Sequence, residues 1–134
     1  MKPACFAPVY IGSYPKLAEI ARSHGYAMAV HGTLARDMDL ICIPWTKEVS
    51  DPQAVVDEIT TTYAFEALPG GPHPHEHGRL VFTLIVSFGE CFIDLSFMPR
   101  AALTDAERTK ADSEPRNPIE QSENPERTAG GGET

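Results

Sequence analysis

The stretch from His31 to Trp45, HGTLARDMDLICIPW, constrains the fold of this chain more than any other part of it. Its apolar, β-rich run Leu40 to Ile43 predicts a strand. Two carboxylates, Asp37 and Asp39, lead into this run at alternate positions, and residues two apart on a strand point to the same face. Because two like charges that close repel each other, the pair indicates a cation nearby.

A hard divalent cation, Mg²⁺ or Mn²⁺, is the expected partner, because it prefers oxygen ligands and keeps water and substrate phosphates as further ligands. Asp94, in the second apolar run CFIDLSF, is the candidate third carboxylate. A charged residue in an apolar strand is costly to bury unless it is paired or metal-bound. The alternative for Asp37 and Asp39 is a pair of solvated carboxylates at a strand entrance. With Asp94 added, the sequence favours a metal site.

Three short motifs in a fixed order carry a family resemblance. They are Gly32-Thr33, the run Asp37 to Leu40, and Ile93-Asp94-Leu95. Together they resemble the signature of the DNA polymerase β-type nucleotidyltransferase superfamily, especially its minimal members, over roughly residues 15 to 100. The chain is also similar to short uncharacterised phage and prophage proteins with RDxDL…PW and IDLSxMPR motifs.

This resemblance implies transfer of a nucleoside monophosphate from a nucleoside triphosphate to an unidentified hydroxyl acceptor. In the family, a glycine-Ser/Thr corner holds the triphosphate, which implies phosphate contacts from Gly32 and Thr33. The family's three acids hold two metal ions, which implies catalytic and metal-binding roles for Asp37, Asp39 and Asp94. Two such ions stabilise the attacking and leaving oxygens of an in-line displacement.

Two arginines are further candidate phosphate ligands, because a guanidinium pairs well with phosphate oxygens. Arg36 precedes the acid pair, and a salt bridge to one of those acids is its alternative role. Arg79 ends the loop PGGPHPHEHGR, residues 69 to 79, which could fold over the acids as a lid.

The same loop carries three alternating histidines, His73, His75 and His77. An extended backbone would place all three on one side, where Zn²⁺ or Ni²⁺ could bind. Weak metal binding without a function is the more usual behaviour of such tracts.

Two other functions fit the same motifs. Only Leu34, Ala35 and Arg36 separate the corner from the first acid, whereas most family members have a longer segment there. The chain is also too short for the family's usual extra helical domain. One alternative is therefore a catalytically inactive binding or regulatory protein of phage or prophage origin, with a protein partner. The other is a metal-dependent phosphodiester hydrolase, because three acids alone do not distinguish hydrolysis from transfer.

Local patterns predict a single α+β (mixed α/β) domain over residues 1–104, nucleotidyltransferase-like, with helices packed on one face of a small mixed sheet. Helices are expected from Ser13 to Gly25 and from Ser50 or Asp51 to Tyr63, after a poorly specified extended segment over residues 1 to 12. Strands are expected over residues 26–30, 40–43, 80–88 and 91–97, the last two as an antiparallel hairpin. His31 is expected to be a partly buried structural residue rather than a base. Trp45 is expected to pack in the core or at its rim rather than to stack on a nucleotide base.

Charge and composition limit the remaining possibilities. The net charge is −8, and residues 1–100 hold 11 acidic against 7 basic side chains, so no basic field favours nucleic acid. Residues 105–134 read as an acidic, largely disordered tail with a short helix over about 105 to 111. Three widely spaced cysteines read as buried thiols in a reducing cytoplasm, the host's if a phage encodes the chain. No targeting or membrane segment is expected.

Overall fold

The computed structural model describes residues 5–86, 89–101 and 105–113. The chain divides into two compact units, residues 1–100 and 101–134. The second unit contains helix α3 (Asp105–Ser113), which confirms the short helix predicted there. The predicted disorder of the tail falls mainly on residues 114–134, outside the described residues.

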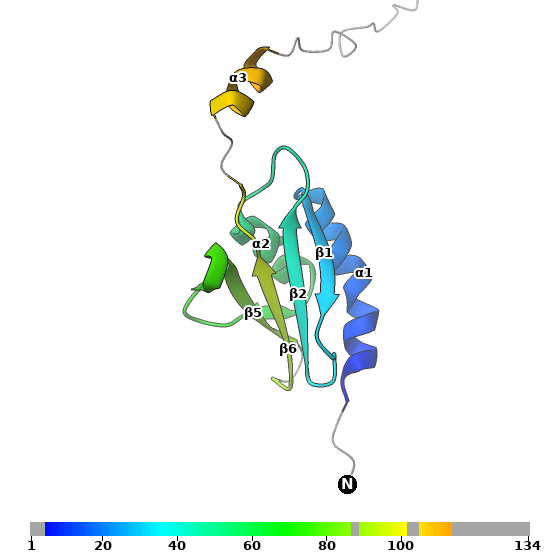
Figure 1. The fold of residues 1–134 in the computed structure, drawn as a ribbon. Helices are drawn as coiled ribbons and strands as arrows, with labels where there is room; N and C mark the ends of the chain where they lie inside the picture. The colour runs from blue at the N-terminus through cyan, green and yellow to red at the C-terminus, as the bar shows by residue number, and fades with distance from the viewer. Residues whose placement is uncertain (1–4, 87–88, 102–104, 114–134) are drawn as a thin grey trace, which may run out of the picture. The chain divides into compact units, whose positions relative to one another are not determined.

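The first unit is built on one mixed sheet (Figure 1). Its strands are β1 (Tyr26–His31), β2 (Asp37–Pro44), β3 (Phe65–Ala67), β4 (His73–Pro74), β5 (Leu80–Val86) and β6 (Cys91–Phe97). They lie in the order β1-β2-β6-β5-β3, and β4 also pairs with β5. The β2–β6 pair is parallel, and the other pairs are antiparallel. The predicted α+β class with a mixed sheet is confirmed, as is the antiparallel pairing of β5 with β6.

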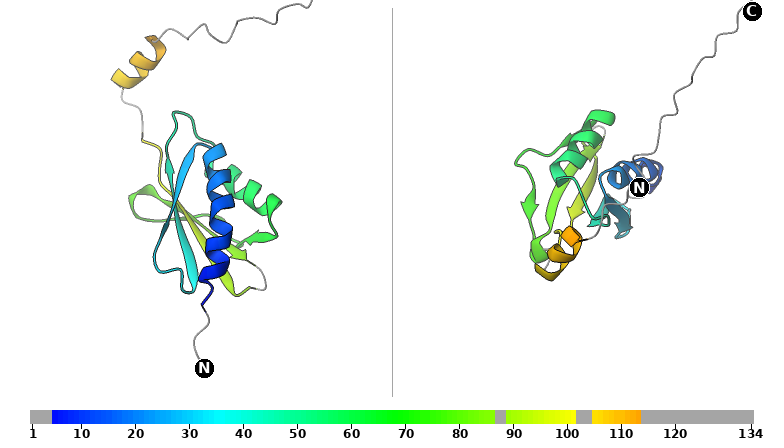
Figure 2. Two further views of the ribbon diagram at one scale, coloured as in Figure 1. Left: turned by 90° about the vertical axis from the view of Figure 1, so that its right-hand side faces the viewer. Right: turned by 90° about the horizontal axis from the view of Figure 1, so that it is seen from above.

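Two helices, α1 (Ala7–Ser23) and α2 (Pro52–Thr62), cover one face of this sheet (Figure 2). Alternation along each strand sends one set of side chains to the helices, and these form the buried core with Leu17 of α1 and Ile59 of α2. On β2 the core residues are Met38, Leu40 and Cys42, none of which is exposed to solvent. Burial of this apolar surface is the main contribution to stability.

Helix α1 begins two turns earlier than the sequence predicts, so the expected extended segment over residues 1 to 12 is wrong from Ala7 onward. Pro8 is compatible with the first turn of a helix, where a missing N–H costs nothing. Pro15 lies inside the helix but is exposed, and its lost hydrogen bond is offset by the buried Tyr10, which anchors the first turns. Helix α2 begins as predicted, with the Asp51 carboxylate accepting a hydrogen bond from Gln53 N at 2.9 Å.

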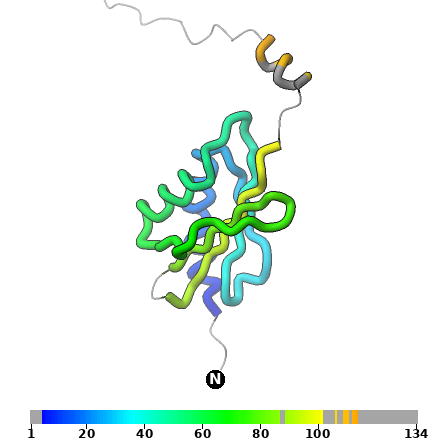
Figure 3. Tube along the Cα trace, turned by 90° about the vertical axis from the view of Figure 1, so that its left-hand side faces the viewer, coloured from blue at the N-terminus to red at the C-terminus, as the bar shows by residue number. Residues whose placement is uncertain are grey.

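The loop over residues 69–79 is more ordered than its composition predicts; it is the green segment between β3 and β5 in Figure 3. It contains β4 and a 3₁₀ turn (Glu76–Gly78), and His75 N donates to Arg79 O at 2.9 Å. His77 has a positive φ of 61°, so the backbone is not extended through the three histidines. The arrangement that would place all three imidazoles on one side of an extended strand is therefore absent.

Buried and exposed positions correct three smaller expectations. Trp45 is 78% exposed and so is not a core residue, and His31 is exposed rather than partly buried. Cys42 and Cys91 are buried free thiols as expected, and burial raises the pKa of Cys42 to about 12, whereas Cys5 is exposed.

Within the described ranges, no helix has the length and apolar character needed to cross a membrane. Residues 87–88 of the predicted β5 arm lie outside the described residues.

Candidate functional site

The face of the sheet opposite the helices carries the acids, and we refer to it as the open face. Asp39 and Asp94 are directly opposite each other on the parallel strands β2 and β6. His31 of β1 is opposite Asp39, and Thr83 of β5 is opposite Asp94. These four residues form a row across four strands, the polar row, with neighbouring strands about 4.8 Å apart. The two strands that carry the acids are thus neighbours.

Asp39 is the electrostatic centre of the polar row. Burial is the largest of the effects that raise the pKa of its carboxyl above the ordinary value of an aspartate. The positive charge that His31 can carry lowers this pKa, whereas the negative charges of Asp94 and Asp37 raise it. Both other carboxylates therefore act electrostatically on Asp39, and the alternate spacing in the sequence predicts this for Asp37. A cation beside Asp39 would relieve this repulsion.

Gly32 gives the Asp39 carboxylate its space. Gly32 has a φ of +83°, a backbone conformation that residues with a side chain rarely adopt. A Cβ atom added at this position would lie 3.0 Å from Asp39 Oδ2. The corner between β1 and β2 therefore lies against the first acid of the polar row. The group that lies close to Gly32 in the structure is the Asp39 carboxylate.

Asp94 is held in place by its neighbour on β5. The Thr83 hydroxyl donates to Asp94 Oδ1 at 2.5 Å. Among the described residues this is the hydrogen bond that the structure gives to the Asp94 side chain, which leaves Oδ2 for a ligand or a proton. Sequence reasoning did not select Thr83, although it is the single polar residue in the run LVFTLIV. Its place opposite Asp94 depends on the observed register of β5 against β6.

Asp37 lies one step further along the open face, where β2 begins. It is exposed and is opposite Phe92 of β6. Together with Arg36, Glu90 and Phe6 these residues line a pocket of about 310 Å³. The described residues contain no ion pair of Arg36, so its predicted salt bridge to an acid is not formed. The aromatic side of this pocket was missed, because no local sequence pattern places Phe6 beside Phe92.

Arg79 lies over the same face, at the next open-face position of β6. Its Nη1 donates to Ser96 Oγ at 3.0 Å, and Ser96 is two residues beyond Asp94. Its Nη2 is 3.5 Å from Glu76 Oε2, a pair that the exposed position of Glu76 weakens. The structure therefore places Arg79 on the face that carries the acids, beyond Asp94, whereas Arg36 lines the pocket at Asp37.

The Gly32-Thr33 corner differs from a phosphate-binding helix start. It leads through five residues, 32–36, directly into β2 without any helix. The Thr33 hydroxyl accepts a hydrogen bond from Ala35 N at 3.4 Å, within its own turn. Leu34 has a positive φ of 59° and packs against the core. The corner itself does not open into a helix, as a phosphate-binding turn of that kind would. The start of α1 lies beside it, since Phe6 N donates to Ala35 O at 3.2 Å.

The carboxylate oxygens of Asp39 and Asp94 in the polar row are of the ligand type that a hard divalent cation prefers. Their negative charges also repel each other in the absence of a cation. Across the part of the chain that the structure describes, no three His, Cys, Asp or Glu side chains are grouped closely enough to hold a metal ion. Mg²⁺ is commonly held by one or two carboxylates, with water and substrate phosphates as its other ligands. Asp39 and Asp94 fit that smaller set, with Asp37 as an outer neighbour.

We compared the chain with known proteins. No protein-family model, no curated protein and no solved structure matches it.

Proposed function

We propose that this chain is a metal-dependent nucleotidyltransferase whose site is the polar row on the open face. The observation that carries the proposal is the register that sets Asp39 opposite Asp94 on parallel neighbouring strands, with Asp37 two residues before Asp39. The motif order supports it, since the sequence resembles that superfamily at the same residues. The donor is a nucleoside triphosphate, and the acceptor is a hydroxyl group.

Asp39 and Asp94 would hold Mg²⁺ or Mn²⁺ together with substrate phosphate oxygens. Bound there, the cation would supply charge stabilisation to the attacking and leaving oxygens. Thr83 fixes one oxygen of Asp94, so the other oxygen can accept the proton of the acceptor hydroxyl, which is a weak nucleophile near neutral pH. Arg79 supplies a guanidinium on the same face for a phosphate group, after exchange of its bond to Ser96.

Arg36 and the small pocket beside Asp37 extend this site. The pocket has a cation, two acids and two aromatic rings at its walls. Its volume of about 310 Å³ is at the lower end for a small-molecule site. We assign it to the part of the substrate beyond the reacting phosphate.

Titration calorimetry tests the proposal. The full chain is titrated with ATP, GTP, CTP and UTP, each with and without Mn²⁺, beside Asp39→Asn. Asp57→Asn is the matched control, because Asp57 is an exposed acid on α2, on the other face of the sheet. Metal-dependent binding of a nucleotide that is lost in Asp39→Asn and kept in Asp57→Asn supports the proposal. Equal binding by both variants would refute it.

A second candidate is a catalytically silent protein that binds nucleotides or a protein partner through the same face. The observation that favours it is the corner over residues 32–36, which has no helix and uses Thr33 in its own turn. Release of pyrophosphate or of a nucleotide monophosphate distinguishes the candidates. Pyrophosphate without free nucleoside monophosphate indicates transfer, a released nucleoside monophosphate indicates hydrolysis, and nucleotide binding without either product indicates the silent protein.

A further inference from the structure

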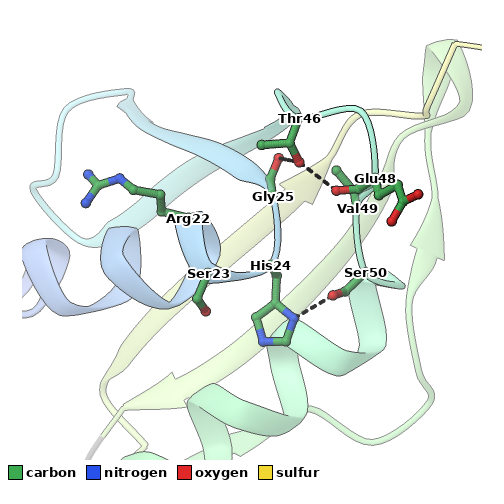
Figure 4. A pocket seen from close by; sticks show the side chains of 8 residues that line it. All are labelled: Arg22, Ser23, His24, Gly25, Thr46, Glu48, Val49 and Ser50. Carbon is green, nitrogen blue, oxygen red and sulfur yellow. Dashed lines mark hydrogen bonds between the residues drawn. The ribbon is translucent and has the colours of Figure 1, made fainter. Parts of the chain in front are cut away.

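A second polar site lies beyond the Pro44 end of β2, whereas the acids lie toward its Asp37 end. It is a pocket of about 340 Å³ between the end of α1 and the loop that leads into α2 (Figure 4). His24 and Ser50 lie side by side in it and come from these two segments. Nothing in the proposed nucleotide site uses these residues.

Three side chains form a hydrogen-bonded chain here. Ser50 Oγ is 2.8 Å from His24 Nδ1 (Figure 4). The other ring nitrogen, His24 Nε2, contacts Glu58 Oε2 on α2 in a short hydrogen bond. The His24 side chain is 18% exposed and Glu58 is 45% exposed, so the chain runs from the pocket to the surface.

Backbone contacts hold these groups in register. Ser50 N donates to His24 O at 3.0 Å, so the two residues are joined by main chain as well as by side chains. The Tyr26 hydroxyl donates to Ser50 O at 2.7 Å. The distance from Ser50 Oγ to His24 Nδ1 is therefore set by a fixed frame rather than by two free side chains.

The order of groups has a chemical consequence. A carboxylate can only accept, so in the neutral imidazole Nε2–H donates the hydrogen bond to the Glu58 carboxylate. The lone pair of Nδ1 then faces Ser50 Oγ, and the imidazole can accept the hydroxyl proton. Nucleophile, base and orienting acid are arranged in the order that activates a serine hydroxyl.

The other hydroxyls of the pocket lack this arrangement. Ser23 Oγ donates to Ile20 O at 2.7 Å, and Thr46 Oγ1 donates to Glu48 O at 2.6 Å. Both protons are thus committed to backbone carbonyls, which are poor bases. Ser50 is paired with an imidazole instead, which makes Ser23 a matched control within the same pocket.

We propose that Ser50 is a nucleophile that His24 and Glu58 activate for acyl transfer from small esters. Ser50 Oγ bonds to the ester carbonyl carbon while its proton passes to His24 Nδ1. The carbon–oxygen bond to the leaving group then breaks, and the leaving alcohol takes that proton. Water repeats the sequence on the acyl-serine, releases the carboxylic acid and restores the Ser50 hydroxyl. The pocket volume suits a short acyl group.

The test uses a fluorophosphonate probe and p-nitrophenyl acetate with the full chain. In the probe reaction, the Oγ–phosphorus bond forms, fluoride leaves, and the Ser50 proton passes through His24 to solvent. We expect one adduct, mapped by peptide mass spectrometry to Ser50 and absent from Ser50→Ala. His24→Ala should slow labelling about 100-fold, the size of a lost general base. Ser23→Ala should label like the unmodified chain.

Glu58→Gln is a second variant for the case that His24→Ala does not fold. Glu58 is a partly exposed side chain on α2, so its substitution should leave the fold intact. It should slow labelling at least 10-fold, since an amide supports the required tautomer poorly. Circular dichroism confirms that each variant is folded. An unlabelled parent chain, an adduct on another residue, or equal labelling rates in the parent and Glu58→Gln would overturn the proposal and leave the three residues as a structural link between α1 and α2.

Discussion

Successive residues of β2 differ sharply in their surroundings. Leu40 points toward α1 and α2 and is 0% exposed, whereas Asp39 and Ile41, its neighbours on either side, are half-buried on the open face. The same alternation on β6 buries Leu95 and leaves Asp94 on the open face. One face therefore carries the apolar burial that stabilises the fold, and the other is available for binding. Substitutions on the two faces should affect different measurements.

The largest expected effect is on the covered face. Leu40→Ala should lower the free energy of unfolding by about 2–5 kcal/mol, because it removes buried methyl groups and leaves a cavity. Ile41→Ala, one residue along and on the open face, should cost about 1 kcal/mol or less. Chemical denaturation of both variants measures the difference. Equal losses would show that the open face is also covered in solution.

Gly32→Ala tests the contact between the corner and Asp39. The positive φ should cost about 1–2 kcal/mol of stability. Gly71→Ala is the control, because Gly71 has a φ of +74° with nothing within 4 Å of an added Cβ. We expect similar losses of stability, but weaker Mn²⁺-dependent nucleotide binding only in Gly32→Ala, since its Cβ would lie 3.0 Å from Asp39 Oδ2 and crowd that carboxylate. Unchanged binding in Gly32→Ala would separate the corner from the site.

Thr83→Val removes the hydrogen bond to Asp94 and keeps the shape of the side chain. It should cost about 1 kcal/mol of stability, the usual net value of such a bond, and should weaken nucleotide binding. Thr83→Ser keeps the hydroxyl and should retain the binding. Calorimetry and denaturation of the two variants check this, and identical behaviour would show that Thr83 does not position Asp94.

Asp39→Asn should have the smallest effect on stability, and a favourable one at neutral pH. A carboxyl with a raised pKa in the folded protein binds more protons than it does in the unfolded chain, so stability falls as pH rises from its ordinary pKa through the raised value. The asparagine variant lacks this loss. Its stability advantage should therefore appear above that window and vanish below the ordinary pKa of aspartate. Denaturation curves across acidic and neutral pH measure it, and a disadvantage at neutral pH would contradict the raised pKa.

The covered face was largely predictable from sequence, and the open face less so. Alternation in DMDLICI and CFIDLSF identifies which residues of β2 and β6 share a face, and the structure agrees. The pairing of Asp39 with Asp94 depends on strand order, which no local pattern encodes. That adjacency came from the family resemblance.

Other features required contacts between distant parts of the chain. The early start of α1 depends on burial of Tyr10, which outweighs an internal proline. The Ser50, His24 and Glu58 chain joins residues 26 and 34 positions apart, so neither spacing nor composition predicts it. The periodicity of the sequence predicts which residues share one face of a helix or strand. Contacts between distant residues form only when these helices and strands pack together.

Paramagnetic line broadening by Mn²⁺ tests the central claim most directly. The full chain, labelled with ¹⁵N, is titrated with a small amount of Mn²⁺ in the presence of nucleoside triphosphate. We predict that the amide signals of Gly32, Asp39 and Asp94 broaden first, and that Asp39→Asn abolishes the effect. Broadening confined to His73–His77, or unchanged in Asp39→Asn, would contradict a metal site on the open face.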